Sequence, residues 1–141
     1  MPVQVLDVFD IAKAHRDAGE LRGRTTALDT NRMHTVVLCY KIPRERDEMH
    51  CHNQDQAFYL VDGQATLHFP DGGHETLKPG MLATITGGTF YQLENSGDGP
   101  MVIIQSRSGS EKATKKIDYI TRKEVTEHRH YIPANASMPR R

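Results

Sequence analysis

The side chains of this chain best suited to chemistry are two histidines, His50 and His52, separated by one residue. Alternate residues of a β-strand leave the same face about 7 Å apart, so both imidazoles can reach one ion. Gln56 follows after a short turn that can return its amide to the same pocket. Neutral imidazole is the commonest metal ligand, and a carbonyl oxygen suits harder divalent ions. These residues therefore predict a site for one divalent metal.

Two alternatives stay open for these side chains. The histidines could be an exposed pair on a strand, and Gln56 could hydrogen-bond one imidazole without touching a metal. Cys51 lies between the histidines, but alternation turns it toward the opposite face. With Cys39 it completes the chain's two cysteines, and we expect both to be reduced thiols because no export signal is recognisable.

The elements that must position this site are predicted to be short β-strands. From about Arg32 onward, β-branched and apolar runs recur between turns rich in Gly and Pro. Strands at this spacing, joined by hairpins, are typical of an all-β sandwich or barrel. The predicted strands are MHTVVLCYKI, FYLV, ATLHF, LATIT, FYQLE and MVIIQS.

The two ends of the chain differ from this central part. Asp10 to Ala18 predicts a short helix, with Asp10 as its N-cap and Gly19 as its end. We expect residues 1–30 to form an N-terminal extension with this helix and residues 31–107 to form the barrel. Residues 108–141 are then a C-terminal strand, KIDYIT, and a flexible tail. That strand would join either the barrel edge or a partner subunit.

The spacing around the histidines resembles the first motif of the cupin family. That motif has His-x-His, three or four residues, Glu, six residues and Gly. This chain has His50-x-His52, three residues, Gln56, six residues and Gly63. The resemblance implies a single cupin β-barrel of the jelly-roll type, with one divalent metal inside it.

A weaker match to the second cupin motif follows in the chain. The motif has Pro-x-Gly, two residues, His, three residues and Asn, where this chain has Thr86-x-Gly88, two residues, Tyr91, three residues and Asn95. Tyr91 thus stands at the position of the fourth metal ligand. The resemblance implies a ligand set of His50, His52, Gln56 and Tyr91.

Both departures from the family pattern bear on the chemistry. A Gln cancels none of the metal's charge, so the ion stays a stronger Lewis acid and favours anionic ligands. Some lyases and sugar-ring isomerases among the cupins resemble this chain in having Gln there. Tyr91 either ligates as phenolate, stands off as a catalytic base or hydrogen-bond donor, or is an ordinary core aromatic.

The pocket beside the metal has three further candidate residues. Alternation places Phe58 and Leu60 on the face of Gln56, where they would wall the pocket. His68 lies in ATLHF on the face opposite Leu67, and we include it as a candidate pocket residue. Apolar walls with a few converging polar groups are the usual form of a small-molecule site.

Composition excludes several other classes of function. The chain has 141 residues, enough for one domain, and 18 basic residues balance 18 acidic ones. This balance argues against nucleic-acid binding, and no run of about 18 apolar residues indicates a membrane span. The N-terminus lacks the pattern of a signal peptide, so we expect a cytoplasmic protein.

Two functions of different classes remain. One is a metal-dependent enzyme acting on a small oxygen-rich or carboxylated metabolite, with dioxygenase or lyase/isomerase chemistry at iron, manganese, zinc or nickel. The other is a non-catalytic cupin that binds or senses a small molecule. The family resemblance also implies a homodimer.

Overall fold

The computed structural model describes residues 2–126, so the expected flexible tail lies largely outside the described residues. Within them the chain forms a ten-residue helix, short antiparallel strands and one 3-10 turn. The elements are α1 Val8–Asp17, β1 Arg22–Asp29, β2 Met33–Tyr40, β3 His50–His52, β4 Gln56–Asp62, β5 Ala65–His68, β6 His74–Leu77, β7 Leu82–Ile85, β8 Gln92–Asn95, β9 Met101–Ser108, η1 Glu111–Ala113 and β10 Lys116–Asp118.

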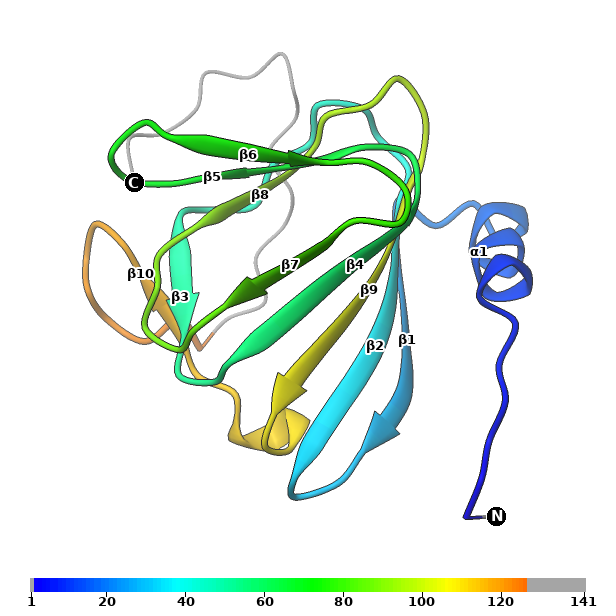
Figure 1. Ribbon diagram of the computed structural model, residues 1–141, viewed down its shortest axis with the longest axis horizontal. Coiled ribbons are helices and arrows are strands. Elements are labelled where there is room, and N and C mark those ends of the chain that lie inside the picture. The colour runs from blue at the N-terminus through cyan, green and yellow to red at the C-terminus, as the bar shows by residue number, and fades with distance from the viewer. Residues whose placement is uncertain (1, 127–141) are drawn as a thin grey trace.

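The strands form a sandwich whose larger layer is a five-stranded sheet in the order β1-β2-β9-β4-β7 (Figure 1). Facing it are a three-stranded sheet, β6-β5-β8, and the pair β10-β3. A β-bridge between His50 and Tyr91 connects these two smaller sheets, with N···O distances of 2.9 and 2.8 Å. The all-β class is confirmed. The sheets described do not close on one another, so the barrel is not confirmed and the fold is a β-sandwich with one helix.

Strand β2 is buried on both faces, because α1 covers the outer side of its sheet. Val36 and Leu38 point into the sandwich, whereas Val37 and Cys39 pack with Ala12 of the helix. This explains why β2 reads as a nearly continuous apolar run, since both faces of the strand avoid water. The helix therefore closes the outside of the sheet that carries the site.

The predicted helix is confirmed, although it begins earlier than the sequence indicated. Asp7, and not Asp10, is the N-cap, and its carboxylate accepts from the backbone N–H groups of Phe9 and Asp10 at 3.0 and 3.2 Å. Gly19 follows the C-terminus with φ 71°, a left-handed conformation that favours glycine. No helix among residues 2–126 has the length and apolar character needed to cross a bilayer.

Strand β1 was missed, because its sequence RGRTTALD lacks an apolar pattern. It lies at the edge of the sheet, and only Gly23 is buried in it, so little of its surface must avoid water. A Cβ atom on Gly23 would lie 2.3 Å from the His15 ring, which makes glycine necessary for the helix to pack here. Within the predicted C-terminal strand KIDYIT, the first three residues form β10, which pairs with β3 of the same chain, and turns follow them.

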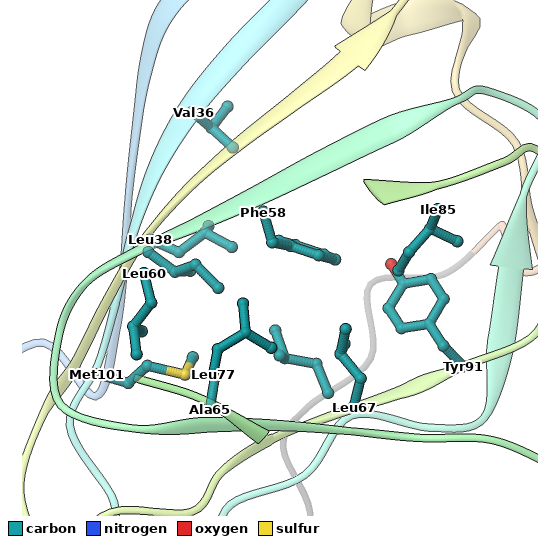
Figure 2. Packing of buried hydrophobic residues seen from close by; sticks show 12 residues of the cluster. Val36, Leu38, Phe58, Leu60, Ala65, Leu67, Leu77, Ile85, Tyr91 and Met101 are labelled. Carbon is teal, nitrogen blue, oxygen red and sulfur yellow. The ribbon is translucent and has the colours of Figure 1, made fainter. Parts of the chain in front are cut away.

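Side chains from both layers meet in one core (Figure 2). Along β4, Gln56, Phe58 and Leu60 point inward, while Tyr59 is 42% exposed, as alternation predicted. The aliphatic part of the core lies around Leu60 and Met101, and Tyr91 and Phe58 mark its aromatic end. The polar candidate residues lie next to that aromatic end, so the sandwich is apolar along most of its length and polar at one end.

A buried ion pair joins strand β1 to the loop that leads into β3. The Arg22 guanidinium contacts the Glu45 carboxylate, which is fully buried, and donates to Asp47 at 2.7 Å. It also lies 4.4 Å from the centre of the Tyr40 ring. Burial raises the pKa of Glu45, and the positive charge of Arg22 opposes that rise. The pair therefore holds a carboxylate where water does not solvate it.

The exposure of two leucines predicts a large difference in stability between matched variants. Leu60 is fully buried and Leu82 is 62% exposed. We expect Leu60→Ala to lower the free energy of unfolding by about 2–5 kcal/mol because it leaves a cavity in the core. Leu82→Ala, the same change on the surface, should cost less than about 1 kcal/mol. Urea denaturation measures both, and equal losses would contradict the assigned core.

The ion pair predicts a pH-dependent loss of stability in Arg22→Met. Without the guanidinium, the pKa of Glu45 in the folded state rises further above its ordinary value of 4.5. The loss relative to the wild type should therefore be small below about pH 4.5 and grow as the pH rises, reaching about 3–5 kcal/mol at neutral pH. Urea denaturation from pH 4 to 8 measures it. The control Arg22→Met/Glu45→Gln should lack the growth, and a loss constant with pH in Arg22→Met would refute the assignment.

Candidate functional site

Strand β3 brings the two histidines together inside the sandwich. His50 and His52 are both buried, and their Nε2 atoms lie 3.1 Å apart with the ring planes nearly perpendicular. Cys51 lies between them on the strand, so its side chain leaves the opposite face of β3. In the sheet it is paired with Ile117 of β10. The alternative that His50 and His52 are exposed on a strand is therefore wrong. The two imidazoles are buried and face each other at one position.

Hydrogen bonding determines which nitrogen of His50 faces the interior. Its Nδ1 contacts the backbone carbonyl of Glu48, and a carbonyl oxygen only accepts, so Nδ1 carries the proton. The Nε2 lone pair of His50 is then directed toward His52, which is how proteins orient a metal-ligating imidazole. Burial, assisted by the charge of Lys116, lowers the pKa of His50 to about 4. Burial and then the charge of Arg107 lower the pKa of His52 to about 2, so both rings are neutral near pH 7.

The other two motif residues lie beside the histidines. The Tyr91 hydroxyl donates to Gln56 Oε1 at 3.4 Å, and the Tyr91 ring centre lies 4.7 Å from that of His50. Tyr91 is only 1% exposed, and burial raises the pKa of its phenol, which therefore stays protonated. The structure thus gathers His50, His52, Gln56 and Tyr91 in one place, although they come from three different segments.

Arg107 is a central residue of this site that the sequence analysis missed. It pairs directly with Gln56 in the register of β4 and β9, so both side chains leave the same inner face. Its Nε donates to Gln56 Oε1 at 2.9 Å, and its Nη2 donates to His52 Nε2 at 2.9 Å. Turning the Gln105 amide lets its oxygen accept from the same guanidinium. Extending the predicted strand MVIIQS by one residue would have placed Arg107 on the inner face with Ile103 and Gln105.

Arg107 also differs in charge balance from the other arginines around the site. Arg22 is paired with two carboxylates, and Arg24 contacts Glu111. Within residues 2–126 no carboxylate forms an ion pair with Arg107, which is 9% exposed and bonded to neutral groups. A buried cation without a countercharge strongly favours an anion beside it.

A cavity of about 670 Å³ opens in front of these groups. Of the three candidate pocket residues, Phe58 lines it, whereas Leu60 lies in the aliphatic core. His68 does not line it either, because its face of β5 is the outer one, where its Nε2 lies 2.7 Å from Glu94. Its lining includes His50, His52, Phe58, Tyr91, Gln105 and Arg107, together with the acidic Asp47 and Glu111 and the basic Arg22, Arg24 and Lys116.

The donor set can be tested for its fit to a divalent metal. When two nitrogens each lie about 2.1 Å from one ion and the angle between them at the ion is about 90–109°, they are about 3.0–3.4 Å apart. The Nε2 atoms of His50 and His52, 3.1 Å apart, lie within this range. With Nε2 of His52 accepting from Arg107, its buried Nδ1 has no partner among residues 2–126. That part of the chain contains no cluster of three or more His, Cys, Asp or Glu side chains able to hold a metal. The residues therefore fit a metal only as a neutral set in which Gln56 completes the histidine pair, with the protonated Tyr91 phenol beside it.

Comparisons with known proteins agree with this fold. Residues 39–106 match the family model of the cupin domain. An uncharacterised protein with a double-stranded β-helix domain from Klebsiella pneumoniae is 21% identical, with a TM-score of 0.66 over 81% of this chain and 96% of that one. A cupin domain from Bordetella pertussis is 20% identical, with a TM-score of 0.54 over 63% and 94%.

A third similar structure is the DMSP lyase DddQ from Ruegeria pomeroyi. It is 12% identical, with a TM-score of 0.59, and the match covers 73% of this chain and 54% of the lyase. No curated protein matches the sequence. At these identities the likeness establishes the fold, and the chemistry depends on the residues described above. Residues 39–106 form a cupin domain, and this chain is a small cupin-domain protein.

Proposed function

We propose that this protein is a metal-dependent cupin enzyme that acts on a small carboxylated metabolite. The observation that carries the proposal is the buried Arg107 guanidinium, which faces the cavity beside two neutral imidazoles and lacks a carboxylate partner among residues 2–126. A guanidinium binds a carboxylate through two parallel hydrogen bonds, and such pairs are strongest where water is excluded. A carboxylate in the cavity would supply the missing negative charge.

The residues of the site have distinct parts in this function. His50 and His52 would hold the metal, with Gln56 as the third ligand. The bound metal would act as a Lewis acid on an oxygen of the substrate. Arg107 binds and orients the carboxylate, while Phe58 presents an apolar wall that limits water. The Tyr91 hydroxyl holds a proton inside the site and can deliver it to a substrate.

These side chains favour lyase or isomerase chemistry over dioxygenation. Elimination and isomerisation both need a proton to be moved at the substrate, and the Tyr91 phenol is a buried proton donor beside the imidazoles. One protein of the same fold is a DMSP lyase, so the fold is compatible with such a reaction. Dioxygenation stays the second reaction class and would require iron.

A non-catalytic carboxylate-binding cupin is the second candidate function. It is favoured by one observation, that His52 Nε2 and Gln56 Oε1 both accept hydrogen bonds from Arg107. Elemental analysis of the freshly purified protein separates the two functions. The homodimer and the cytoplasmic location stay predictions.

The histidine pair predicts metal content in matched variants. His50→Ala and His52→Ala each remove a nitrogen from the shared position, so we expect metal affinity to fall by more than about tenfold, since even an outer-shell partner contributes that much, and the purified variants to retain less metal than the wild type. Cys51→Ala lies between them on the opposite face and should keep wild-type metal content. Plasma mass spectrometry measures the metal. A wild type without metal, or histidine variants that retain it, would leave the non-catalytic function.

The position of Arg107 predicts that the protein loses affinity for carboxylates when its guanidinium is removed. Removing one partner of a buried charge pair costs about 2–5 kcal/mol, so Arg107→Met should weaken binding of small keto- and hydroxy-acids by at least about 30-fold. Arg24→Met removes the same charge from the cavity wall, where Glu111 neutralises it, and should have a much smaller effect. Titration calorimetry with a panel of such acids measures both variants. Equal losses would mean that Arg107 is not the anchor.

For the reaction itself, Tyr91→Phe keeps the ring and removes the proton donor. We expect the variant to bind the same acids as the wild type while kcat falls by about 100-fold, the usual contribution of a positioned acid. Product formation from each acid that binds is followed by chromatography. An unchanged kcat would exclude Tyr91 from proton delivery.

A further inference from the structure

We infer that Arg107 couples the binding of metal to the binding of carboxylate, so that each ligand strengthens the binding of the other. Without an anion the guanidinium holds His52 Nε2 and Gln56 Oε1, two of the atoms that a metal would need. A carboxylate that engages Arg107 draws it from these acceptors and frees them. The inference rests on the proposed function, because it assumes that both ligands use this cavity.

Arg107 and a metal would compete for His52 because its imidazole nitrogen has only one lone pair. An imidazole nitrogen that accepts a hydrogen bond uses its one lone pair, which lies in the ring plane, and a metal needs the same lone pair. His52 Nε2 lies 2.9 Å from Nη2 of Arg107, a full hydrogen bond. His52 therefore binds either Arg107 or the metal through Nε2.

The amide of Gln56 is engaged in the same way. Its Oε1 accepts from Arg107 Nε at 2.9 Å and from the Tyr91 hydroxyl at 3.4 Å. In the unturned orientation of its amide, Gln105 Nε2 also donates to this oxygen, at 3.2 Å. One guanidinium thus blocks two candidate ligands from two different strands.

Charge acts in the same direction as the hydrogen bonds. A divalent ion held by neutral ligands next to an unpaired guanidinium would place like charges side by side in a poorly solvated site. A carboxylate bound to Arg107 cancels part of that charge and can also contact the metal. The cavity of about 670 Å³ has room for the anion and for the displaced guanidinium. Linkage then requires the metal and the carboxylate to raise each other's affinity by the same factor.

The coupling can be measured by titrating Co²⁺ into the metal-free protein by calorimetry, in acetate and in chloride at equal ionic strength. The probe anion is acetate, and its weak binding to free Co²⁺ is corrected by a blank titration. For the wild type we expect Co²⁺ affinity about tenfold higher in acetate than in chloride, within the usual range of coupling between sites. The visible absorption of bound Co²⁺ reports independently whether nitrogen ligands are engaged.

Two variants separate lone-pair competition from simple repulsion. Arg107→Met should bind Co²⁺ about tenfold more tightly than the wild type in chloride and should respond little to acetate. Lys116→Met removes a positive charge from the same cavity without touching the bonds of His52 or Gln56, and should keep the wild-type response to acetate. Circular dichroism checks folding, and Arg107→Gln replaces the Met variant if that variant fails to fold.

Each result decides between the two claims. Wild-type affinity that is equal in acetate and chloride would overturn the coupling and leave the proposed metal enzyme standing. If Lys116→Met matched Arg107→Met, repulsion alone would account for the data and the competition would be refuted. An absence of Co²⁺ binding under every condition, in the wild type and in the variants, would overturn both the coupling and the proposed function.

Discussion

The site depends on one buried guanidinium held by neutral partners. Burying an unpaired charge is costly unless its donors are all satisfied, and Arg107 finds Gln56, His52 and Gln105 around it. The same bonds fix the position of the Gln56 amide and the His52 ring. Since no described carboxylate forms an ion pair with the guanidinium, its charge favours an anion in the cavity.

The charge of this site differs from the charge that the cupin motif implies, because Gln56 stands where the motif has Glu. A carboxylate ligand would bring negative charge from the protein itself, whereas the set found here is neutral and lies beside a cation. In the proposed function the countercharge comes from the ligand, so that the substrate would complete the electrostatics of the site. This explains how the two departures from the family motifs, Gln56 and Tyr91, fit together with Arg107 in one function. The proposed preference for anionic metabolites rests on the same charge balance.

Contacts elsewhere in the fold hold together the elements that carry this site. Helix α1 seals the outer face of β2, and the Arg22–Glu45 pair fixes the loop that leads into β3. The bridge between His50 and Tyr91 ties the histidine strand to the neighbouring three-stranded sheet. The candidate ligands thus come from segments whose backbones are hydrogen-bonded, which is the usual requirement for a site that binds with precise geometry.

Local patterns in the sequence determined much of the fold. Alternation along a strand placed His50 and His52 on one face with Cys51 on the other, and placed Gln56 with Phe58 and Leu60. The apolar runs and turns indicated most strands, and the capping residues indicated the helix. These features depend on neighbours in the chain, which a sequence displays directly.

Only the tertiary structure decided which faces look inward and which distant residues meet. Alternation gave His68 a face of its strand, but packing made that face the outer one. The edge strand β1 carried too little apolar surface to be recognised. Arg107 lies beside Gln56 because β4 and β9 pair in one register, across a separation of 51 residues. Such pairing is set by the packing of the whole sandwich, and no local pattern of residues encodes it.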